Sequence, residues 1–287
     1  MSVYANKGSL TSEQIERYDR EGYVVIERLL TEEDMVPPKE AMQRKVSLIA
    51  DDLFKAGLIG NKLEHRPFSH RLAELFEGLD EAKFLKYGSS WRDRFPGYYH
   101  LIGNPKILDA VESLIGGEIF ANPVYNVRPK VPKVAAGLVP WHQDKSYWPD
   151  ANANPVITVW IPLVDATLEN GCLHIKPRTH KKRLLKSHRE TYSGTGMLAL
   201  KDGQLGNTDT VILPMTAGSA VLFNDRLLHM STPNLTEAVR WSVDLRYQPT
   251  DQDPMPQHGA GFLVRSHRHP ERAATLEDWL NLRAKHE

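Results

Sequence analysis

The stretch that decides the fold is RWSVDLRYQP, residues 240–249. Polar and apolar residues alternate strictly in it, as they do in a β-strand whose successive side chains point to opposite faces. One face carries Arg240, Ser242, Asp244 and Arg246, and the other carries Trp241, Val243, Leu245 and Tyr247. A half-buried strand normally turns its polar face to water. In a closed roll the polar face can instead line an internal cavity while the apolar face packs under helices, and this strand alone leaves both arrangements open.

The sequence before this strand favours a closed roll. From about residue 118, short β-rich runs alternate with Pro, Gly and Asn: IFANPVYNVRP, VITVWIPLVDAT, GCLHIKP and TVILPMTAGSAVLFND. Many short strands at this spacing are typical of a sandwich or barrel. We therefore predict a mainly β fold with additional helices. Its core would be a double-stranded β-helix, a cupin-like jelly roll over residues 118–250, with N-terminal helices packed on one sheet.

The first 117 residues are predicted to form a mainly helical layer. Residues 11–14 (TSEQ) have the spacing of a helix capping box, and GYVVIERLL, residues 22–30, predicts a short strand. A second helix is expected to begin at TEED, residues 31–34, and to be interrupted at Pro37 and Pro38. Since no repeat or linker divides the chain, we predict one domain over 1–287, with 251–287 as a C-terminal tail.

Composition excludes several classes of function. Lys plus Arg and Asp plus Glu both number 36 in the 287 residues, so the net charge is zero. A nucleic-acid-binding protein would need a basic excess. The single cysteine, Cys172, excludes an internal disulfide and is expected to be a core residue. With no run of about 18 apolar residues and no signal-peptide or SKL-type pattern, we expect a cytoplasmic protein without nucleic-acid or membrane partners. The oligomeric state is left open.

WHQD, residues 141–144, suggests a metal site. On a strand, His142 and Asp144 would project from the same face. Two ligands from one strand and one from a distant segment are the layout of a 2-His-1-carboxylate triad, which suits Fe(II) and leaves positions open. The lack of clustered cysteines disfavours structural zinc. The candidate third ligand is His229, which follows the strand GSAVLFND. For any single histidine, a surface or hydrogen-bonded role is the ordinary alternative.

If the polar face of residues 240–247 points inward, Arg240 is a buried cation near that site. A buried arginine is costly unless an anion pairs with it. A dicarboxylate cosubstrate would supply the anion, and the guanidinium fork matches a carboxylate. Exposure of this face to solvent is the competing arrangement.

The ordered motifs together resemble the phytanoyl-CoA dioxygenase family of Fe(II)/2-oxoglutarate oxygenases. The resemblance rests on TSEQIERYDREGYVVIERLLTEED, WHQD, VWIPLVDATLENGCLHIKPRTHK and HMSTPNLTEAVRWSVDLRY, in that order. It implies that the iron is held by His142, Asp144 and His229. It further implies that 2-oxoglutarate is bound by Arg240, with Ser231, Ser242, Trp148 and Asn126 as assisting or lining residues. Relatives that halogenate have a small residue where this chain has Asp144, so the aspartate favours oxygenation.

The reaction implied by the resemblance consumes O2 and 2-oxoglutarate, releases succinate and CO2, and hydroxylates an aliphatic C–H of a small-molecule metabolite or biosynthetic intermediate. Two alternatives stay open. One is desaturation, cyclisation, epimerisation or endoperoxide formation with the same cofactors, and the other is a non-catalytic jelly-roll module that retains a metal. The expected substrate contacts are Arg246, Asp244, Tyr147 and Trp160. For Arg246 and Asp244 an internal salt bridge is the alternative.

Overall fold

A computed structural model describes residues 8–91, 93–134, 137–148, 155–191, 195–253 and 259–282. The helices are α1 (Ser12–Glu21), α2 (Glu32–Lys55), α3 (Phe68–Leu75), α4 (Glu81–Lys83), α5 (Pro96–Ile102), α6 (Pro105–Ile115) and α7 (Leu276–Asn281). The strands are β1 (Tyr23–Ile26), β2 (Glu118–Ala121), β3 (Asn126–Lys130), β4 (Val139–His142), β5 (Ile157–Pro162), β6 (Leu173–Lys176), β7 (His188–Arg189), β8 (Leu198–Ala199), β9 (Val211–Leu213), β10 (Ala220–Asn224), β11 (Leu228–Ser231), β12 (Arg240–Pro249) and β13 (Phe262–Ser266). A π-helical turn, η1 (Phe84–Gly88), and a 3-10 turn, η3 (Asp144–Tyr147), bear on the site.

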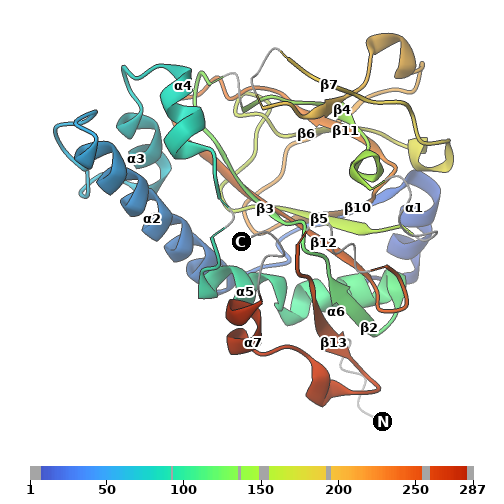
Figure 1. Ribbon diagram of the computed structural model, residues 1–287. Helices are drawn as coiled ribbons and strands as arrows, with labels where there is room; N and C mark the ends of the chain where they lie inside the picture. The colour runs from blue at the N-terminus through green and yellow to red at the C-terminus, as the bar shows by residue number, and fades with distance from the viewer. Residues whose placement is uncertain are drawn as a thin grey trace.

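Two antiparallel sheets form the core. The larger sheet has the order β1-β10-β5-β12-β2-β13, with β3 also paired to β12, and the smaller has the order β4-β11-β6-β9. Figure 1 shows the smaller sheet above, the larger sheet across the middle, and helices α5 and α6 beneath the larger sheet. The predicted jelly roll with helices packed on one sheet is confirmed.

Strand β12 has helices on one face and the interior of the roll on the other, as its alternation of polar and apolar residues predicts. On its outer face, the Trp241 ring stacks on Phe68 of α3 with centroids 4.7 Å apart. The Tyr247 hydroxyl donates to the backbone carbonyl of Ile102 in α5, at 2.8 Å. Trp241 and Tyr247 are completely buried. The helices thus cover the apolar face, and the polar face of β12 lines the interior of the roll.

The capping box predicted at Thr11 is confirmed, and the helix predicted to begin at residues 31–34 does so, with a second capping box at Thr31. The predicted interruption at Pro37 and Pro38 is wrong, because α2 continues through both to Lys55. Each proline removes a backbone donor, but burial along the remaining turns outweighs that cost. The buried residues of α2 include Met35, Ala41, Met42, Val46, Ile49 and Leu53.

The segment predicted to be a C-terminal tail is part of the fold where the structure describes it. Strand β13 pairs with β2 and extends the larger sheet. Trp279 of α7 is buried, and its ring lies 5.9 Å from that of Tyr99 in α5. A bulge between Leu263 and Arg265 breaks the alternation of β13, which explains why the sequence pattern did not reveal the strand. None of the helices in the described part of the chain combines the length and hydropathy needed to cross a bilayer.

Candidate metal centre and cosubstrate pocket

Two histidines face each other across a pair of strands in the smaller sheet. His142 at the end of β4 is in direct register with His229 of β11, and their ring centroids are 4.1 Å apart. The Nδ1 atom of His142 lies 2.8 Å from the carbonyl oxygen of Pro140, and that of His229 lies 2.9 Å from the carbonyl oxygen of Leu227. An Nδ1–H that donates to these carbonyls leaves each Nε2 lone pair free for a metal.

Asp144 completes the group. Its Oδ1 atom lies 3.4 Å from Nε2 of His142 and 3.9 Å from Nε2 of His229. The candidate ligand atoms of the three residues lie within 4.8 Å of one another, and this is the one such group found among the described residues. All three side chains are buried. Two imidazoles and one carboxylate whose ligand atoms converge in this way are the donor set that suits Fe(II).

The prediction that Asp144 lies on the strand needs correction. Strand β4 ends at His142, and Asp144 is the first residue of η3. Gln143 between them is still extended (φ −117°, ψ 128°), so the two side chains project to the same side as expected. The chain then turns because the backbone N–H of Lys145 donates to the carbonyl of Asp225, at 2.8 Å.

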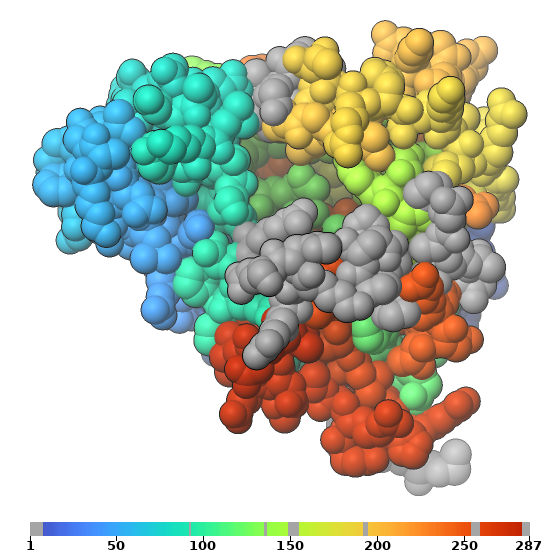
Figure 2. Space-filling model, in the orientation of Figure 1, coloured from blue at the N-terminus to red at the C-terminus, as the bar shows by residue number. Residues whose placement is uncertain are grey.

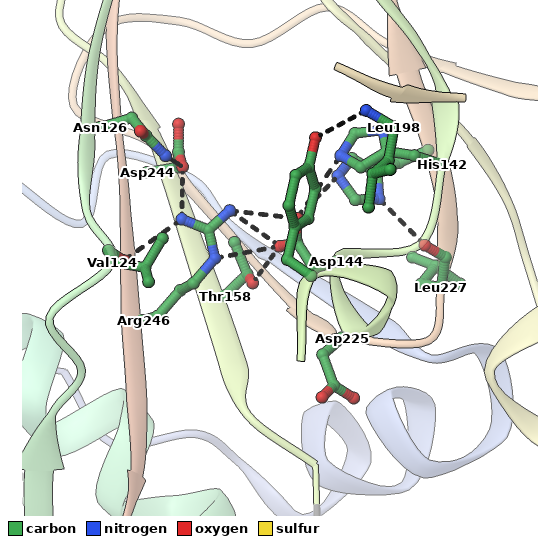
Figure 3. Close-up of polar contacts among 12 residues, drawn as sticks. Val124, Asn126, His142, Asp144, Thr158, Leu198, Asp225, Leu227, Asp244 and Arg246 are labelled. Atoms are coloured by element: carbon green, nitrogen blue, oxygen red, sulfur yellow. Dashed lines mark hydrogen bonds and ion pairs between the residues drawn. The ribbon is translucent and has the colours of Figure 1, made fainter. Parts of the chain in front are cut away.

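Arg246 on β12 holds Asp144 in place from the larger sheet. Its Nη2 lies 3.1 and 3.0 Å from the two carboxylate oxygens of Asp144, and its Nε lies 3.2 Å from Oδ2. Thr158 of β5 donates to the same Oδ2 at 2.7 Å. Figure 3 shows the Arg246 guanidinium between Asp144 and Asp244. The metal centre therefore joins the two sheets.

The electrostatic surroundings favour the metal-binding protonation states. Burial raises the pKa of Asp144, but the positive charge of Arg246 and the neighbouring imidazoles hold it well below its usual range. Burial and His142 lower the pKa of His229 to about 3. The carboxylate is thus ionised and the His229 imidazole neutral, as metal ligation requires.

Arg246 and Asp244, predicted as substrate contacts, form the internal salt bridge that the sequence left open as the alternative. Nη1 of Arg246 lies 2.7 Å from Oδ2 of Asp244. Asn126 also donates to Oδ2 of Asp244, at 2.7 Å, and Arg128 donates from Nε to Oδ1. Arg246 and Asp244 are 5% and 3% exposed. The N–H groups of Arg246 are directed at Asp144, Asp244 and the carbonyl of Val124, and the oxygens of Asp244 accept from Arg246, Asn126 and Arg128. This geometry therefore lends no support to a substrate contact.

Arg240 has the surroundings of an anion-binding residue. It is 2% exposed, and its Nη1 donates to the hydroxyl of Ser242. Its guanidinium carbon lies 5.4 Å from the ring centre of Trp160. Nε has no hydrogen-bond partner among the described residues. Burial and the nearby charge of Arg128 lower the pKa of Arg240 to about 9. A buried cation with an unused donor is what a carboxylate of a cosubstrate would complete.

The remaining predicted residues lie around the metal-ligand group and Arg240. Trp148 lies under the Arg246 guanidinium at 5.7 Å and donates from Nε1 to Asp225, at 3.2 Å. Tyr147 is 37% exposed, and its hydroxyl accepts from the backbone N–H of Leu198 at 3.2 Å. Ser231, at the end of β11, accepts a hydrogen bond from Lys130 at 2.7 Å.

Two adjoining cavities, of about 130 and 490 Å³, open between β3, η1 and the segment around Thr195. Both are lined by Arg128, Val127 and Trp91, and the smaller also by Lys130 and Arg240. Figure 2 shows this face hollowed between the turquoise region that contains η1 and the yellow region beyond β6. The larger volume suits a small organic ligand.

Sequence reasoning missed three residues of the site: Thr158, Arg128 and Lys130. A signal for two of them was present. In NVRPK, residues 126–130, polar side chains stand at every second position, the same alternation that singled out β12. The run was recognised as part of a β-rich stretch, but the proline within it obscured the alternation. Nothing in the sequence distinguished Thr158 from other strand threonines.

Comparison with known proteins gives a consistent picture. Residues 18–242 match the protein-family model described as phytanoyl-CoA dioxygenase (PhyH). A probable phytanoyl-CoA dioxygenase of Caenorhabditis elegans is 26% identical over 260 residues, which cover 86% of this chain and 78% of that protein. The peroxisomal phytanoyl-CoA dioxygenase of Mus musculus is 24% identical over 253 residues, covering 84% and 69%.

Solved structures share the fold. The non-haem α-ketoglutarate-dependent carbocyclase SnoK from nogalamycin biosynthesis superposes with a TM-score of 0.58 at 21% identity, covering 86% of this chain and 87% of that one. EctD from S. alaskensis, solved with 2-oxoglutarate and 5-hydroxyectoine, gives a TM-score of 0.58 at 18% identity, covering 98% and 86%. At these identities the likeness establishes the jelly-roll architecture.

Proposed function

Because the chain belongs to the phytanoyl-CoA dioxygenase family of non-haem iron, 2-oxoglutarate-dependent dioxygenases, we propose that it hydroxylates an aliphatic C–H of a small-molecule metabolite or biosynthetic intermediate. Its cofactors are iron, 2-oxoglutarate and O2. One observation carries the proposal: a buried 2-His-1-carboxylate group and an arginine with an unused donor face the interior of one roll.

We assign iron binding to His142, Asp144 and His229, and the far carboxylate of 2-oxoglutarate to Arg240 with Ser242. Bound iron would supply the activation of O2 that is coupled to decarboxylation of 2-oxoglutarate to succinate and CO2. The protein supplies geometry: the backbone carbonyls of Pro140 and Leu227 orient the two imidazoles.

The surrounding residues have supporting roles in this proposal. Arg246 and Thr158 hold the carboxylate of Asp144 ionised and fixed in direction. The apolar ring of Trp160, which lies beneath Arg240, lines the cosubstrate position. The larger cavity, which is lined by Arg128 and Met197 among others, is where we place the substrate.

Two alternatives are weighed against hydroxylation. Desaturation, cyclisation, epimerisation and endoperoxide formation use the same ligand set, and one solved structure of the same fold is named a carbocyclase and another an epimerase. Asp144 as a carboxylate ligand favours oxygen transfer over halogenation. Against a non-catalytic binding module stand the complete ligand group and the unpartnered Nε of Arg240.

The test is loading and turnover of the purified protein. Without O2, Fe(II) and 2-oxoglutarate should give the weak visible charge-transfer band of the ternary complex, and with O2 the protein should form succinate even without substrate. His142→Ala should abolish both while the unfolding midpoint stays near that of the unsubstituted protein. His174→Ala, a histidine on β6 outside the ligand group, is the matched control and should keep both signals. Undiminished succinate formation by His142→Ala would refute the iron assignment.

A further inference from the structure

Arg128 on β3 presents its guanidinium to the cavity in which we place the substrate. It lies opposite Ser242 in the register of β3 with β12, and it lines both cavities. Its Nε donates to Oδ1 of Asp244, and its side chain is 29% exposed. Within the described part of the chain Arg128 forms no other hydrogen bond. The N–H groups on both of its Nη atoms are therefore available to a ligand.

Asp244 fixes the direction of this guanidinium. The carboxylate is 3% exposed. Besides the bond from Arg128, it accepts from Asn126 at 2.7 Å and from Nη1 of Arg246 at 2.7 Å. A cation held in this way is already ordered before a ligand arrives, which lowers the entropic cost of binding. Arg128 is thus built as a binding group, whereas the N–H groups of Arg246 are directed at partners within the protein.

The balance of charge in the interior of the roll favours an anion at this position. Three arginines and two carboxylates lie close together there: Arg128, Arg240, Arg246, Asp144 and Asp244. The arginines outnumber the carboxylates even before the buried Lys130, opposite Arg240, is counted. The charges of Fe(II) and of the 2-oxoglutarate dianion cancel, so their binding would leave this excess of positive charge in place. A negative charge on the substrate would reduce it.

The larger cavity offers apolar surface beside Arg128. Leu85 of η1, Trp91 and Met197 line it, together with several hydroxyl groups. The Trp91 ring is held in place, because its Nε1 donates to the carbonyl of Gly88 at 2.7 Å. Element η1 is a π-helical turn, an uncommon structure that is found frequently at functional sites. A ligand with an acidic group and an apolar body would therefore find a complementary surface for each part.

We propose that the substrate is an organic acid whose carboxylate is bound by Arg128 and whose apolar body lies along Leu85, Trp91 and Met197. This inference rests on the proposed function and names the class of its substrate. The two Nη groups would donate side by side to the two carboxylate oxygens, the arrangement for which the planar guanidinium is suited. Arg128 would then determine specificity, and Arg240 would remain with the cosubstrate.

The experiment compares acids with their neutral amides. Hexanoate and 3-phenylpropanoate, with hexanamide and 3-phenylpropanamide, are titrated into the protein without O2, in the presence of saturating Fe(II) and 2-oxoglutarate. Binding is followed by the change in the charge-transfer band. A second readout is the shift of the unfolding midpoint, measured with and without iron. Each acid should bind at least about 10-fold more tightly than its amide, the range expected for hydrogen bonds to a charged group.

Substitution of Arg128 tests whether this residue causes the preference. Arg128→Met should raise the Kd of the acids about 10- to 100-fold and change that of the amides little. Arg128→Lys keeps the charge but not the planar fork, so its loss should be smaller. The Kd of 2-oxoglutarate should change far less than that of the acids in both variants. The control is Arg66→Met, which removes a 41% exposed arginine outside the cavity and should alter none of these values.

The outcomes separate this inference from the proposed function. If neither acid binds more tightly than its amide, or if Arg128→Met weakens acids and amides equally, the carboxylate site is refuted while the iron and Arg240 assignments stand. Tighter binding of hexyl phosphate than of hexanoate would also overturn it, in favour of a phosphate monoester. If the unsubstituted protein gives no band with Fe(II) and 2-oxoglutarate, the proposed function itself fails, whatever the acids do.

Discussion

At the scale of single residues, the arrangement of charge around Asp144 governs both stability and ligand geometry. Arg246 is the shared partner of Asp144 and Asp244, and all three are buried. Arg246→Met should destabilise the protein by about 3–5 kcal/mol, because it leaves the buried carboxylate of Asp144 without its cation and removes one of the two cations paired with Asp244. The free energy of unfolding from urea titration measures this loss.

A substitution at an exposed arginine serves as the control for this prediction. Arg66→Met also removes an arginine paired with a glutamate, Glu74, but the Arg66 side chain is 41% exposed. Its loss should therefore cost far less than the loss of Arg246. Equal costs for the two variants would contradict the importance of the Arg246 network.

The sequence predicted the ligands better than the residues that support them. His142, Asp144 and His229 were identified because the ordered motifs that contain them resemble a known family, and the structure brings them together. Ser242 was expected near the cosubstrate and Trp160 near the substrate, and both contact Arg240. The partners of Asp144 could not be predicted, because which threonine or arginine reaches a given carboxylate depends on the register between strands.

At the scale of elements, the start of α2 is tied to α6. Asp34 closes the capping box with Thr31, accepts from Asn104 Nδ2 at 3.1 Å and pairs with Lys106. Partial burial raises the pKa of Asp34, but the bonds from Lys106 and Thr31 more than offset this and lower it to about 2. Helix caps of this kind contribute about 0.5–2 kcal/mol.

The pH dependence of this contribution has a definite sign. The folded pKa of Asp34 is below its unfolded value of 3.8, so its stabilising effect is complete above about pH 4 and is lost as the pH falls towards 2. Asp34→Asn should therefore lower the free energy of unfolding by about 1–2 kcal/mol at pH 7, with the difference narrowing below pH 4. Urea titrations of both proteins at pH 7, 5 and 3 test this. A difference that stays constant down to pH 3 would contradict it.

Helices and strands were predicted correctly where a polar–apolar pattern extended over many residues. They were predicted wrongly where tertiary packing overrode a local sequence rule. The alternation of β12 gave both its conformation and its two faces, since each face has a different environment over eight residues. Pro37 and Pro38 were expected to interrupt the helix, but the burial of the other residues of α2 stabilises it enough to continue through both. For Asp144 the strand ended two residues early, although the side chain kept its expected direction.

At the scale of the whole molecule, the metal centre connects the two sheets. His142 and His229 lie on the smaller sheet, and Asp144 is tied to the larger through Thr158 and Arg246. Fe(II) added without O2 should therefore raise the unfolding midpoint. At a free metal concentration of 100 times Kd, the gain is about 2.7 kcal/mol. Differential scanning calorimetry measures the shift, and His142→Ala, which lacks one ligand, should show little of it.

The overall architecture was predictable because few folds combine many short strands with an amphipathic helical layer. The strand at each edge of the larger sheet was harder to place. Strand β1 was expected from its composition, but the sequence did not indicate which strand it pairs with. Strand β13 was assigned to a tail. Edge strands are short and have weak patterns of their own, so their place in a sheet depends on neighbours far away in the sequence.

The pairing partners of these two edge strands determine when the larger sheet can form during synthesis. Tyr23 of β1 pairs with Phe223 of β10, two hundred residues later, and β13 joins β2 only near the end of the chain. As the polypeptide leaves the ribosome, β1 has no partner in the larger sheet until β10 has emerged. Contacts of such high sequence separation slow folding, and unpaired strands invite aggregation meanwhile. The nascent chain should therefore depend on chaperone protection until its last third is made.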